Sequence, residues 1–336
     1  MAIELAPLHA TLGAEVRGID LTRPVMPEVF AEIDAAFNRH GILVVPGQPV
    51  TDEQQLAFSR LFGPLEVNPN YAGAKMRLRP DIADISNLDA EGRVLAWDDR
   101  RNLFNIGNQL WHTDSSFKRV PAKCSLLSAR ELPGSGGETE FADLRAAWDA
   151  LPEAKKRQLQ GLVGEHSIFR SRSQIGFADF NDEIFKELPP VPQALVRHHP
   201  ASGRTSLYLA SHASHIIGWP VEEGRALIEE LIAFATQRQF VYQHRWTVGD
   251  LVMWDNRCTM HRGRPYDGTQ RRVLHRATVS DVANTLEQEN LVAPAAAKTR
   301  LNRCWPCRRI GDGDERGPHK PTLTPKTLGS DPRWST

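Results

Sequence analysis

Two histidines and one aspartate in this sequence have the types and the spacing that suit a metal site. His112 and Asp114 stand two residues apart in the stretch LWHTDSSF (110–117). If this stretch is a strand, side chains at i and i+2 point to the same face, so both can reach one ion. Because a His-x-Asp pattern arises by chance about once in a chain of this size, a second histidine from another strand is needed to give it weight.

His261 is the candidate for that second histidine. It follows LVMW (251–254), an apolar run that predicts a buried strand, and the polar pair Asp255-Asn256 that ends the run. Two histidines and one carboxylate on one face of an octahedral ion leave three positions open for substrates, and this set is typical of non-haem Fe(II) oxygenases. The same ligands can bind Zn²⁺ in a hydrolase, so the residues alone leave that alternative open.

Two arginines beyond His261 could hold anionic groups near such a metal. In RRVLHRATV (271–279), Arg272, Leu274 and Arg276 alternate and share one face of the predicted strand. Arginines on the face of a buried strand need anionic partners, and two bound carboxylates would supply them. The alternative is an edge strand whose arginines extend into water.

These residues need a β framework to bring them together, and the rest of the chain predicts one. Helical periodicity or capping signals mark residues 30–37, 51–63, 143–151 and 224–237, and Thr51 with Gln54 has capping-box spacing. Short apolar or β-prone runs lie at 41–47, 123–131, 204–211, 238–246, 249–257 and 271–279. We therefore expect a mainly β protein with helical decoration, a double-stranded β-helix of the jelly-roll, cupin-like type, with a polar site in its mouth.

Composition excludes some classes of partner. The 336 residues contain 41 Lys or Arg and 41 Asp or Glu, so no overall charge attracts nucleic acid or an anionic membrane. The four cysteines are too sparse for the disulfide framework of a secreted protein, and the start MAIELAPLHATLG has no basic segment followed by an apolar run. We expect a cytoplasmic protein that binds neither nucleic acid nor membranes.

The C-terminal segment differs from the rest of the chain. From Leu291 onward there are six prolines and no regular period, with nine Lys or Arg against four Asp or Glu. We expect residues 1–285 to form the folded domain and residues 286–336 a Pro-rich basic tail without stable structure. Cys304 and Cys307 in CWPC have the spacing of a redox motif, but no βαβ context accompanies them.

At these residues the sequence resembles the TauD/TfdA family of Fe(II)/2-oxoglutarate-dependent dioxygenases, typified by taurine dioxygenase and 2,4-dichlorophenoxyacetate dioxygenase. The resemblance covers roughly residues 1–285. It runs through NQLWHTDSSF, ELPGSGGETEFADLRAAWDALP, LASHASHIIGWPVEEGRALIEEL, ATQRQFVYQHRWTVGDLVMWDNRCTMHRGRPYD and QRRVLHRAT. The match is nearer to the phenoxyacetate member in NQLWH, SHASH and WDNRCTMHRG, whereas VNPNYAGAKMRLRPDIADISN, where the family's substrate-covering loop lies, departs from both relatives.

The resemblance implies a role for each residue of the site. His112, Asp114 and His261 fall on the iron ligands. Thr139 and Arg272 fall on the positions that bind the co-substrate 2-oxoglutarate, and dioxygen takes the remaining position on Fe(II). The following residues fall on substrate-facing positions: Arg276, for the acidic head of the substrate, and His199, His212 and His215, of which one or two line the pocket, His199 and His215 being the ones we assign. Each of these histidines has an equally good interpretation as a structural residue.

The resemblance implies hydroxylation of a small carboxylate, an aryloxyalkanoate, next to its ether oxygen, which yields a phenol, an oxo acid, succinate and CO₂. A homo-oligomer is an expectation from the family alone. The alternative within the family is a taurine-type alkylsulfonate dioxygenase that releases sulfite. A jelly-roll protein that binds an anion without catalysis, and a zinc hydrolase, are the alternatives from other classes.

Overall fold

The computed structural model describes residues 3–67, 76–177, 180, 182–292 and 294. By its contacts the chain divides into Met1–Ala297 and Lys298–Thr336, and the second unit lies outside the described residues. The redox motif at Cys304 and Cys307 lies there too, as do residues 68–75 of the segment that departs from the family. Within the described ranges, no helix combines the length and apolar character that crossing a membrane requires.

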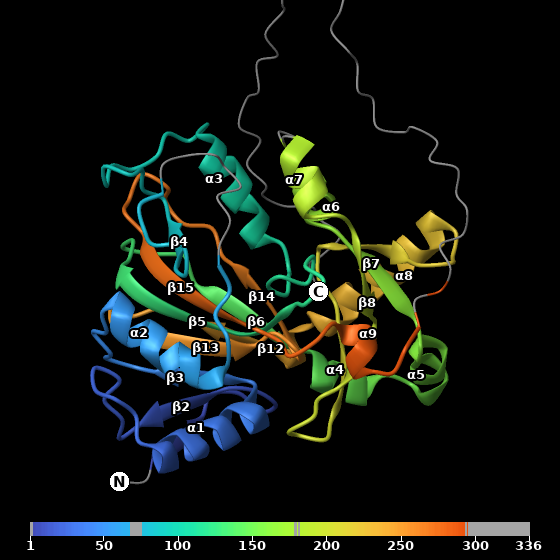
Figure 1. The fold of residues 1–336 in the computed structure, drawn as a ribbon, viewed down its shortest axis with the longest axis horizontal. Coiled ribbons are helices and arrows are strands. Elements are labelled where there is room, and N and C mark those ends of the chain that lie inside the picture. The colour runs from blue at the N-terminus through green and yellow to red at the C-terminus, as the bar shows by residue number, and fades with distance from the viewer. Residues whose placement is uncertain (1–2, 68–75, 178–179, 181, 293, 295–336) are drawn as a thin grey trace, which may run out of the picture. The chain divides into compact units, whose positions relative to one another are not determined.

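The largest sheet joins strands from both ends of the domain (Figure 1). Its order is β1 (Glu4–Pro7), β2 (Ala14–Arg17), β3 (Ile42–Val45), β13 (Leu251–Asp255), β5 (Ala122–Glu131), β15 (Val273–Ser280) and β4 (Ala83–Ser86). Every neighbouring pair is antiparallel except β2 with β3. Because β13 lies between β3 and β5, the sheet forms only when segments some 200 residues apart in the sequence meet.

A second sheet packs against this one and completes the double-stranded β-helix, so the predicted fold class is confirmed. It has the order β12 (Val241–His244), β6 (Thr139–Asp143) and β14 (Thr259–Gly263), all antiparallel. The ring of Phe141 on β6 meets the indole of Trp254 on β13, with 5.5 Å between ring centroids. Of the predicted site residues, Thr139, His261, Arg272 and Arg276 line a cavity whose walls come from both sheets.

The apolar runs of β3 and β13 are explained by burial on both faces. Leu43 and Met253 belong to the apolar cluster formed with the N-terminal helices, whereas Val44 and Trp254 belong to the cluster that includes Phe141 of the second sheet. A strand covered on both sides has no solvent face, so its sequence shows no polar alternation.

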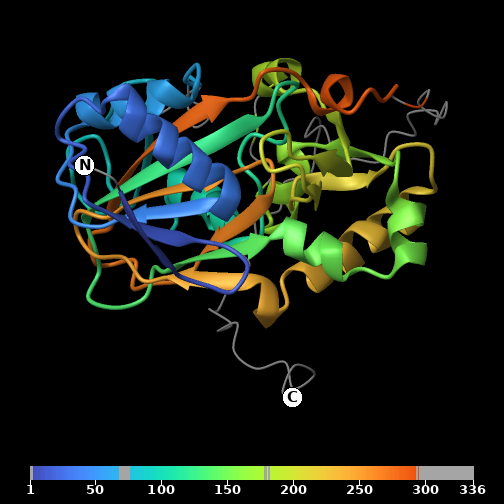
Figure 2. The same ribbon diagram turned by 90° about the horizontal axis from the view of Figure 1, so that it is seen from below.

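Helices α1 (Pro27–His40) and α2 (Asp52–Ser59) cover the outer face of the large sheet, and α1 lies across its strands in Figure 2. The capping box predicted at the start of α2 is present: the Thr51 side chain accepts from the Gln54 backbone N–H, and the Gln54 side chain accepts from the Thr51 N–H. The helix continues as a short 3₁₀ turn, Arg60–Phe62, up to Gly63, where φ is 144°.

The remaining elements lie outside these two sheets, and several of them share an apolar core that includes Trp148, Leu209 and Leu231. The strands are β7 (Val163–His166), β8 (Val191–Ala194) and β11 (Ala213–Ile216), which form a three-stranded sheet, and the pair β9 (Val196–His198) and β10 (Thr205–Leu207). The helices are α3 (Arg100–Asn105), α4 (Leu144–Ala150), α5 (Glu153–Leu159), α6 (Ile168–Gln174), α7 (Asp182–Glu187) and α8 (Val221–Ala235), with 3₁₀ turns at Ile106–Gln109 and Arg238–Phe240. The predicted helices at 143–151 and 224–237 correspond to α4 and α8.

The chain still contributes to this fold beyond residue 285. A short helix, α9 (Thr285–Gln288), packs its Leu286 with Val163 and Ala194. The Thr285 hydroxyl donates a hydrogen bond of 2.7 Å to Gln193 Oε1. The chain therefore packs on the domain as far as Leu291, beyond the predicted start of the tail at residue 286, and residues 295–336 lie outside the described part.

Candidate metal centre and its two cavities

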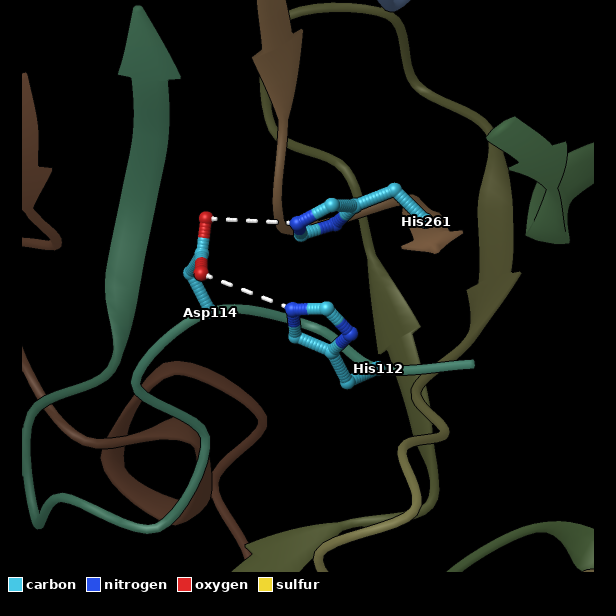
Figure 3. Close-up of side chains that lie close together, drawn as sticks. All are labelled: His112, Asp114 and His261. Atoms are coloured by element: carbon cyan, nitrogen blue, oxygen red, sulfur yellow. Dashed lines mark ion pairs between the residues drawn. The ribbon is translucent and has the colours of Figure 1, made fainter. Parts of the chain in front are cut away.

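The backbone brings the two predicted histidine ligands together. His112 lies in an isolated antiparallel bridge with His261 of β14. The His112 N–H donates to the His261 carbonyl at 2.9 Å, and the His261 N–H donates to the His112 carbonyl at 2.8 Å. This pairing places the imidazole centroids 4.1 Å apart. The two rings point toward Asp114 in Figure 3.

Asp114 completes the triad from a turn rather than from the strand that we predicted. The chain leaves the bridge after His112, and Ser115 has a φ of 54°. Asp114 Oδ1 lies 3.9 Å from His112 Nε2, and Oδ2 lies 3.7 Å from His261 Nε2. Thr113 points away from the triad and donates its hydroxyl to the Leu209 carbonyl at 2.8 Å. The i, i+2 relation thus holds although no regular strand is present.

Neighbouring side chains fix the orientation of the Asp114 carboxylate. Oδ2 accepts a hydrogen bond of 2.7 Å from the Ser125 hydroxyl, and Oδ1 accepts one of 2.5 Å from Arg276 Nη1. The Asn256 side-chain oxygen accepts the Asp114 N–H at 3.1 Å. Burial by itself raises the pKa of Asp114. Arg276 and the two histidines lower this pKa by more than burial raises it, so the pKa lies well below its usual range. Asp114 is therefore a carboxylate at neutral pH.

The three side chains fit a divalent transition metal. One ligand atom from each lies within 4.8 Å of the others. His112 Nδ1 lies 2.8 Å from the Leu110 carbonyl, so this nitrogen carries the proton and Nε2 has a free lone pair toward Asp114. Burial lowers the pKa of His112 and His261, which favours the neutral imidazole that metals bind. The donors are two nitrogens and one oxygen, as a facial triad requires.

A small cavity of about 110 Å³ opens beside the triad and is lined by the two residues predicted to bind 2-oxoglutarate, Thr139 and Arg272. The Thr139 oxygen accepts a hydrogen bond of 3.0 Å from Trp246 Nε1, which leaves its hydroxyl hydrogen for a ligand. Arg272 is buried, and Nη2 donates to the Gly137 carbonyl at 3.0 Å. Burial lowers the pKa of Arg272, and among the described residues no carboxylate pairs with it.

Gly137 is required for this cavity. Its φ is +74°, and a Cβ at this position would lie 2.9 Å from Arg272 Nε. A larger residue would therefore strain the backbone and displace the guanidinium. The glycine-rich turn GSGG (134–137) thus brings the backbone against Arg272.

A larger cavity of about 270 Å³ adjoins the smaller one, and His112 and Arg276 line both. His112, Asp114 and Arg276 line it together with His212. Its apolar wall is formed by Met76, Leu78, Ile82, Ile85, Leu88, Leu95, Phe104, Phe117 and Ile168. The volume is just below the range of about 300–1,000 Å³ for small-molecule sites, and apolar walls beside cationic groups suit an aromatic acid.

Two histidines that we assigned to the substrate pocket lie elsewhere. His199 is buried, and its Nε2 lies 2.8 Å from Asp255 Oδ2 behind the sheet. His215 lies beside Ser214 and Glu165 and is not among the residues that line either cavity. We correct the assignment to His212, which lines the larger cavity and whose Nδ1 bonds to the Ser171 hydroxyl at 2.8 Å.

A second cluster with metal-binding residue types consists of His199, Asp255 and Cys258. The Asp255 carboxylate already accepts a hydrogen bond of 2.6 Å from Arg257 Nη2. Burial raises the pKa of Cys258 to about 12, so the residue is a thiol rather than the thiolate that metals bind. This cluster is a structural ion pair.

Sequence reasoning missed two residues that support the triad, Ser125 and Asn256. The Ser125 hydroxyl donates to Asp114 and also accepts from Asn256 Nδ2 at 3.0 Å. Ser125 lies in the middle of β5, and Asn256 follows β13. Neither carries a pattern that separates it from an ordinary polar residue, and only the adjacency of the strands reveals the role.

Comparison with known proteins agrees with this geometry. The model of the family described as taurine catabolism dioxygenase TauD, TfdA family matches residues 4–278. The alpha-ketoglutarate-dependent 2,4-dichlorophenoxyacetate dioxygenase of Cupriavidus pinatubonensis is 47% identical over 286 residues, which cover 84% of this chain and 99% of the relative. The (S)-phenoxypropionate/alpha-ketoglutarate-dioxygenase of Sphingobium herbicidovorans is 37% identical over 287 residues, 83% of this chain and 95% of the relative.

A solved structure is similar over the same range. The crystal structure of AAD-2 in complex with Mn(II) and N-oxalylglycine has a TM-score of 0.80 and 47% sequence identity, and the match covers 85% of this chain and 100% of that chain. With a family match over most of its length and relatives of this identity, the chain belongs to the TauD, TfdA family of dioxygenases.

Proposed function

We propose that this protein is an Fe(II)- and 2-oxoglutarate-dependent dioxygenase that hydroxylates an aryloxyalkanoate at the carbon beside its ether oxygen. One oxygen atom of O₂ enters the substrate and the other enters succinate, which forms with CO₂ from 2-oxoglutarate. The hydroxylated product is a hemiacetal that collapses to a phenol and an oxo acid. The observation that carries the proposal is that the triad lines two adjoining cavities, of which one contains Arg272 and the other combines apolar walls with cationic groups.

When bound by His112, Asp114 and His261, Fe(II) supplies the activation of dioxygen that couples decarboxylation of 2-oxoglutarate to hydroxylation. The chain's own residues hold the metal ligands, the co-substrate and the substrate in fixed positions. The bridge between the histidines and the hydrogen bond from Ser125 hold the three ligand side chains in place before the metal arrives. Such fixed orientation is what supporting residues contribute at metal sites.

Arg272 and Thr139 bind 2-oxoglutarate in the smaller cavity. The distal carboxylate of the co-substrate supplies the anion that the buried Arg272 guanidinium lacks, and the Thr139 hydroxyl donates one further hydrogen bond. Arg272 directly precedes β15 and Arg276 lies on it, and both arginines line the smaller cavity.

Arg276 binds the carboxylate of the aryloxyalkanoate. Its Nη1 donates to Asp114 Oδ1, and the rest of its guanidinium faces both cavities. A substrate carboxylate at this point places the adjacent carbon near the triad, and alignment to within about an angstrom governs the rate. The apolar wall around Leu88 and Phe104 accommodates the aromatic ring and favours this substrate class over a small alkylsulfonate.

Succinate formation tests the proposal. The protein is loaded with Fe(II) without oxygen, and the reaction starts with O₂ and 2-oxoglutarate in the presence of 2,4-dichlorophenoxyacetate, either enantiomer of phenoxypropionate, or taurine. We expect succinate and phenol with at least one aryloxyalkanoate and no signal from His112→Ala. Sulfite release from taurine alone would identify an alkylsulfonate dioxygenase, and ligand binding without succinate would identify a binding protein. Activity with Zn²⁺ and without 2-oxoglutarate would identify a hydrolase.

We also propose that the protein acts in the cytoplasm as a monomer or homo-oligomer on a free small molecule, without nucleic acid or membrane partners. The balanced charge of the chain supports this proposal. The free thiols of Cys124 and Cys258 are buried, which suits a reducing compartment. Fractionation of cells and the mass of the purified protein in solution test the two parts of the proposal.

A further inference from the structure

Among the described cations that line the larger cavity, Arg172 differs from the others because it lacks a carboxylate partner. The lining of this cavity includes Arg77, Arg101, Lys118, Arg172 and Arg276. Four of these pair with a carboxylate: Arg77 with Asp84 at 2.6 Å, Arg101 with Asp99 at 2.9 Å, Lys118 with Glu66 at 2.5 Å and Arg276 with Asp114 at 2.5 Å. Within the part of the chain that the structure describes, Arg172 has no such partner.

Arg172 is also deeply buried in the wall of this cavity. It lies on α6 and is 5% exposed. Its Nη1 donates to the Ser171 hydroxyl at 3.3 Å, and its Nε is buried without a hydrogen-bond partner. Burial lowers the pKa of Arg172 to about 10, so the residue remains a cation at neutral pH. A buried cation without a counter-charge is costly, and a bound anion relieves that cost.

The surrounding chain holds the guanidinium in one place. The Arg172 Cζ lies 4.1 Å from the centroid of the Phe104 ring. On another side is Gly107, where a Cβ would lie 2.2 Å from Arg172 Nη1. The residue next to Arg172, Ser171, bonds to His212, whose ring centroid lies 6.1 Å from that of His112. The cation is therefore fixed at the end of the cavity where the metal ligands lie.

We propose that Arg172 binds the carboxylate of the organic substrate from the side of His212, while Arg276 holds it from the side of Asp114. This inference rests on the proposed function and names a further specificity-determining residue for it. Two cations on opposite sides of one carboxylate fix both its position and its orientation, and they select acids over neutral analogues of the same shape.

The alternative is that Arg172 serves only as a scaffold that stacks on Phe104. The two interpretations differ in which ligands they affect. A scaffold supports the cavity wall, so its loss weakens every ligand of the cavity alike. A carboxylate-binding residue affects the acid and leaves the neutral analogue unchanged, because only the acid carries the charge that the guanidinium meets.

Calorimetric binding without oxygen separates the two. The full-length protein is saturated with Mn(II) and N-oxalylglycine and then titrated with 2,4-dichlorophenoxyacetate or with its amide. Arg172→Met is compared with Arg170→Met on the same helix, whose guanidinium pairs with Glu229 at 3.3 Å and does not line the cavity. We expect Arg172→Met to weaken binding of the acid by about 30-fold or more. Binding of the amide changes by less than about threefold in either variant, and Arg170→Met binds the acid as the wild type does.

Two further variants test the same inference if Arg172→Met does not fold. Arg172→Lys retains the charge but not the planar fork, and we expect an intermediate loss for the acid. Gly107→Ala keeps Arg172 in the sequence but displaces its guanidinium, and we expect it to weaken binding of the acid selectively as well. Unchanged binding of the acid in all three variants, or an equal loss for acid and amide, overturns the inference.

Failure of this inference differs from failure of the proposed function. If wild-type protein forms succinate with an aryloxyalkanoate and Arg172→Met has the same KM, only the role of Arg172 is wrong. If wild-type protein neither forms succinate nor distinguishes the acid from its amide, both the function and the role of Arg172 are wrong. The expected kinetic signature is a raised KM for the aryloxyalkanoate with an unchanged KM for 2-oxoglutarate.

Discussion

Replacing Arg272 by methionine removes the cation of the smaller cavity and keeps most of its volume. In the described structure the guanidinium has one hydrogen bond, from Nη2 to the Gly137 carbonyl, and no carboxylate partner. The adjacent Arg271 provides a matched control. It is exposed, and its Nε pairs with Glu131 at 2.6 Å on the surface.

The size of the effect follows from what the cavity offers the distal carboxylate of 2-oxoglutarate. Of the described arginines that line this cavity, Arg272 has no acidic partner, whereas Arg264 and Arg276 pair with carboxylates. Loss of the Arg272 guanidinium therefore leaves the distal carboxylate of bound 2-oxoglutarate buried without a counter-charge. Truncating one partner of a buried charged pair costs about 2–5 kcal/mol. Since about 1.4 kcal/mol corresponds to tenfold in affinity, we expect the KM for 2-oxoglutarate to rise by about 30-fold to several thousand-fold. The free energy of unfolding should not fall by a comparable amount, because the guanidinium is unpaired in the free protein.

The assay is succinate formation at varied 2-oxoglutarate, together with calorimetric binding of 2-oxoglutarate to the Mn(II) protein without oxygen. Arg271→Met should match the wild type in both measurements. An unchanged KM for 2-oxoglutarate in Arg272→Met would refute the assignment. An equal rise in the KM of the aryloxyalkanoate would refute the division of roles between Arg272 and Arg276.

Three further predictions follow from other parts of the structure. Arg276→Ala should raise the KM of the aryloxyalkanoate at least tenfold more than that of 2-oxoglutarate, because one buried ionic hydrogen bond is worth about 1.5–3 kcal/mol; equal losses contradict the assignment. Burial lowers the pKa of His166 to about 3 from 6.5, so between these values the unfolded chain binds more protons and stability falls as the pH falls, by about 1.4 kcal/mol per pH unit from this group. His166→Phe should reduce the slope of unfolding free energy against pH by this amount between pH 6 and 4, and an unchanged slope in urea titrations argues against it. The buried Gln55 donates to the carbonyls of Leu126 and His275, so Gln55→Leu should lower the unfolding free energy by about 2–4 kcal/mol, and a loss under about 1 kcal/mol means that water replaces the amide.

Local patterns in the sequence determined those parts of the protein that depend on near neighbours. The capping box at Thr51 and Gln54 formed as predicted because both of its hydrogen bonds close within one turn. The shared face of Arg272 and Arg276 followed from the two-residue period of a strand, which holds in any sheet that contains it. The residue types of the triad also indicated a transition-metal site before any fold was known, although they left both an Fe(II) oxygenase and a zinc hydrolase open.

Tertiary structure alone decided which histidines and which cations belong to the site. His212 and His215 stand three residues apart in SHASH, yet of the two only His212 lines the cavity, because β11 and the turn before it set the direction of each side chain. Ser125 and Arg172 reach the site from β5 and α6, and nothing in their local sequence indicates it. A residue's distance from the metal site depends on how strands and helices far apart in the chain pack together. Local sequence patterns report only on near neighbours, so they do not show that distance.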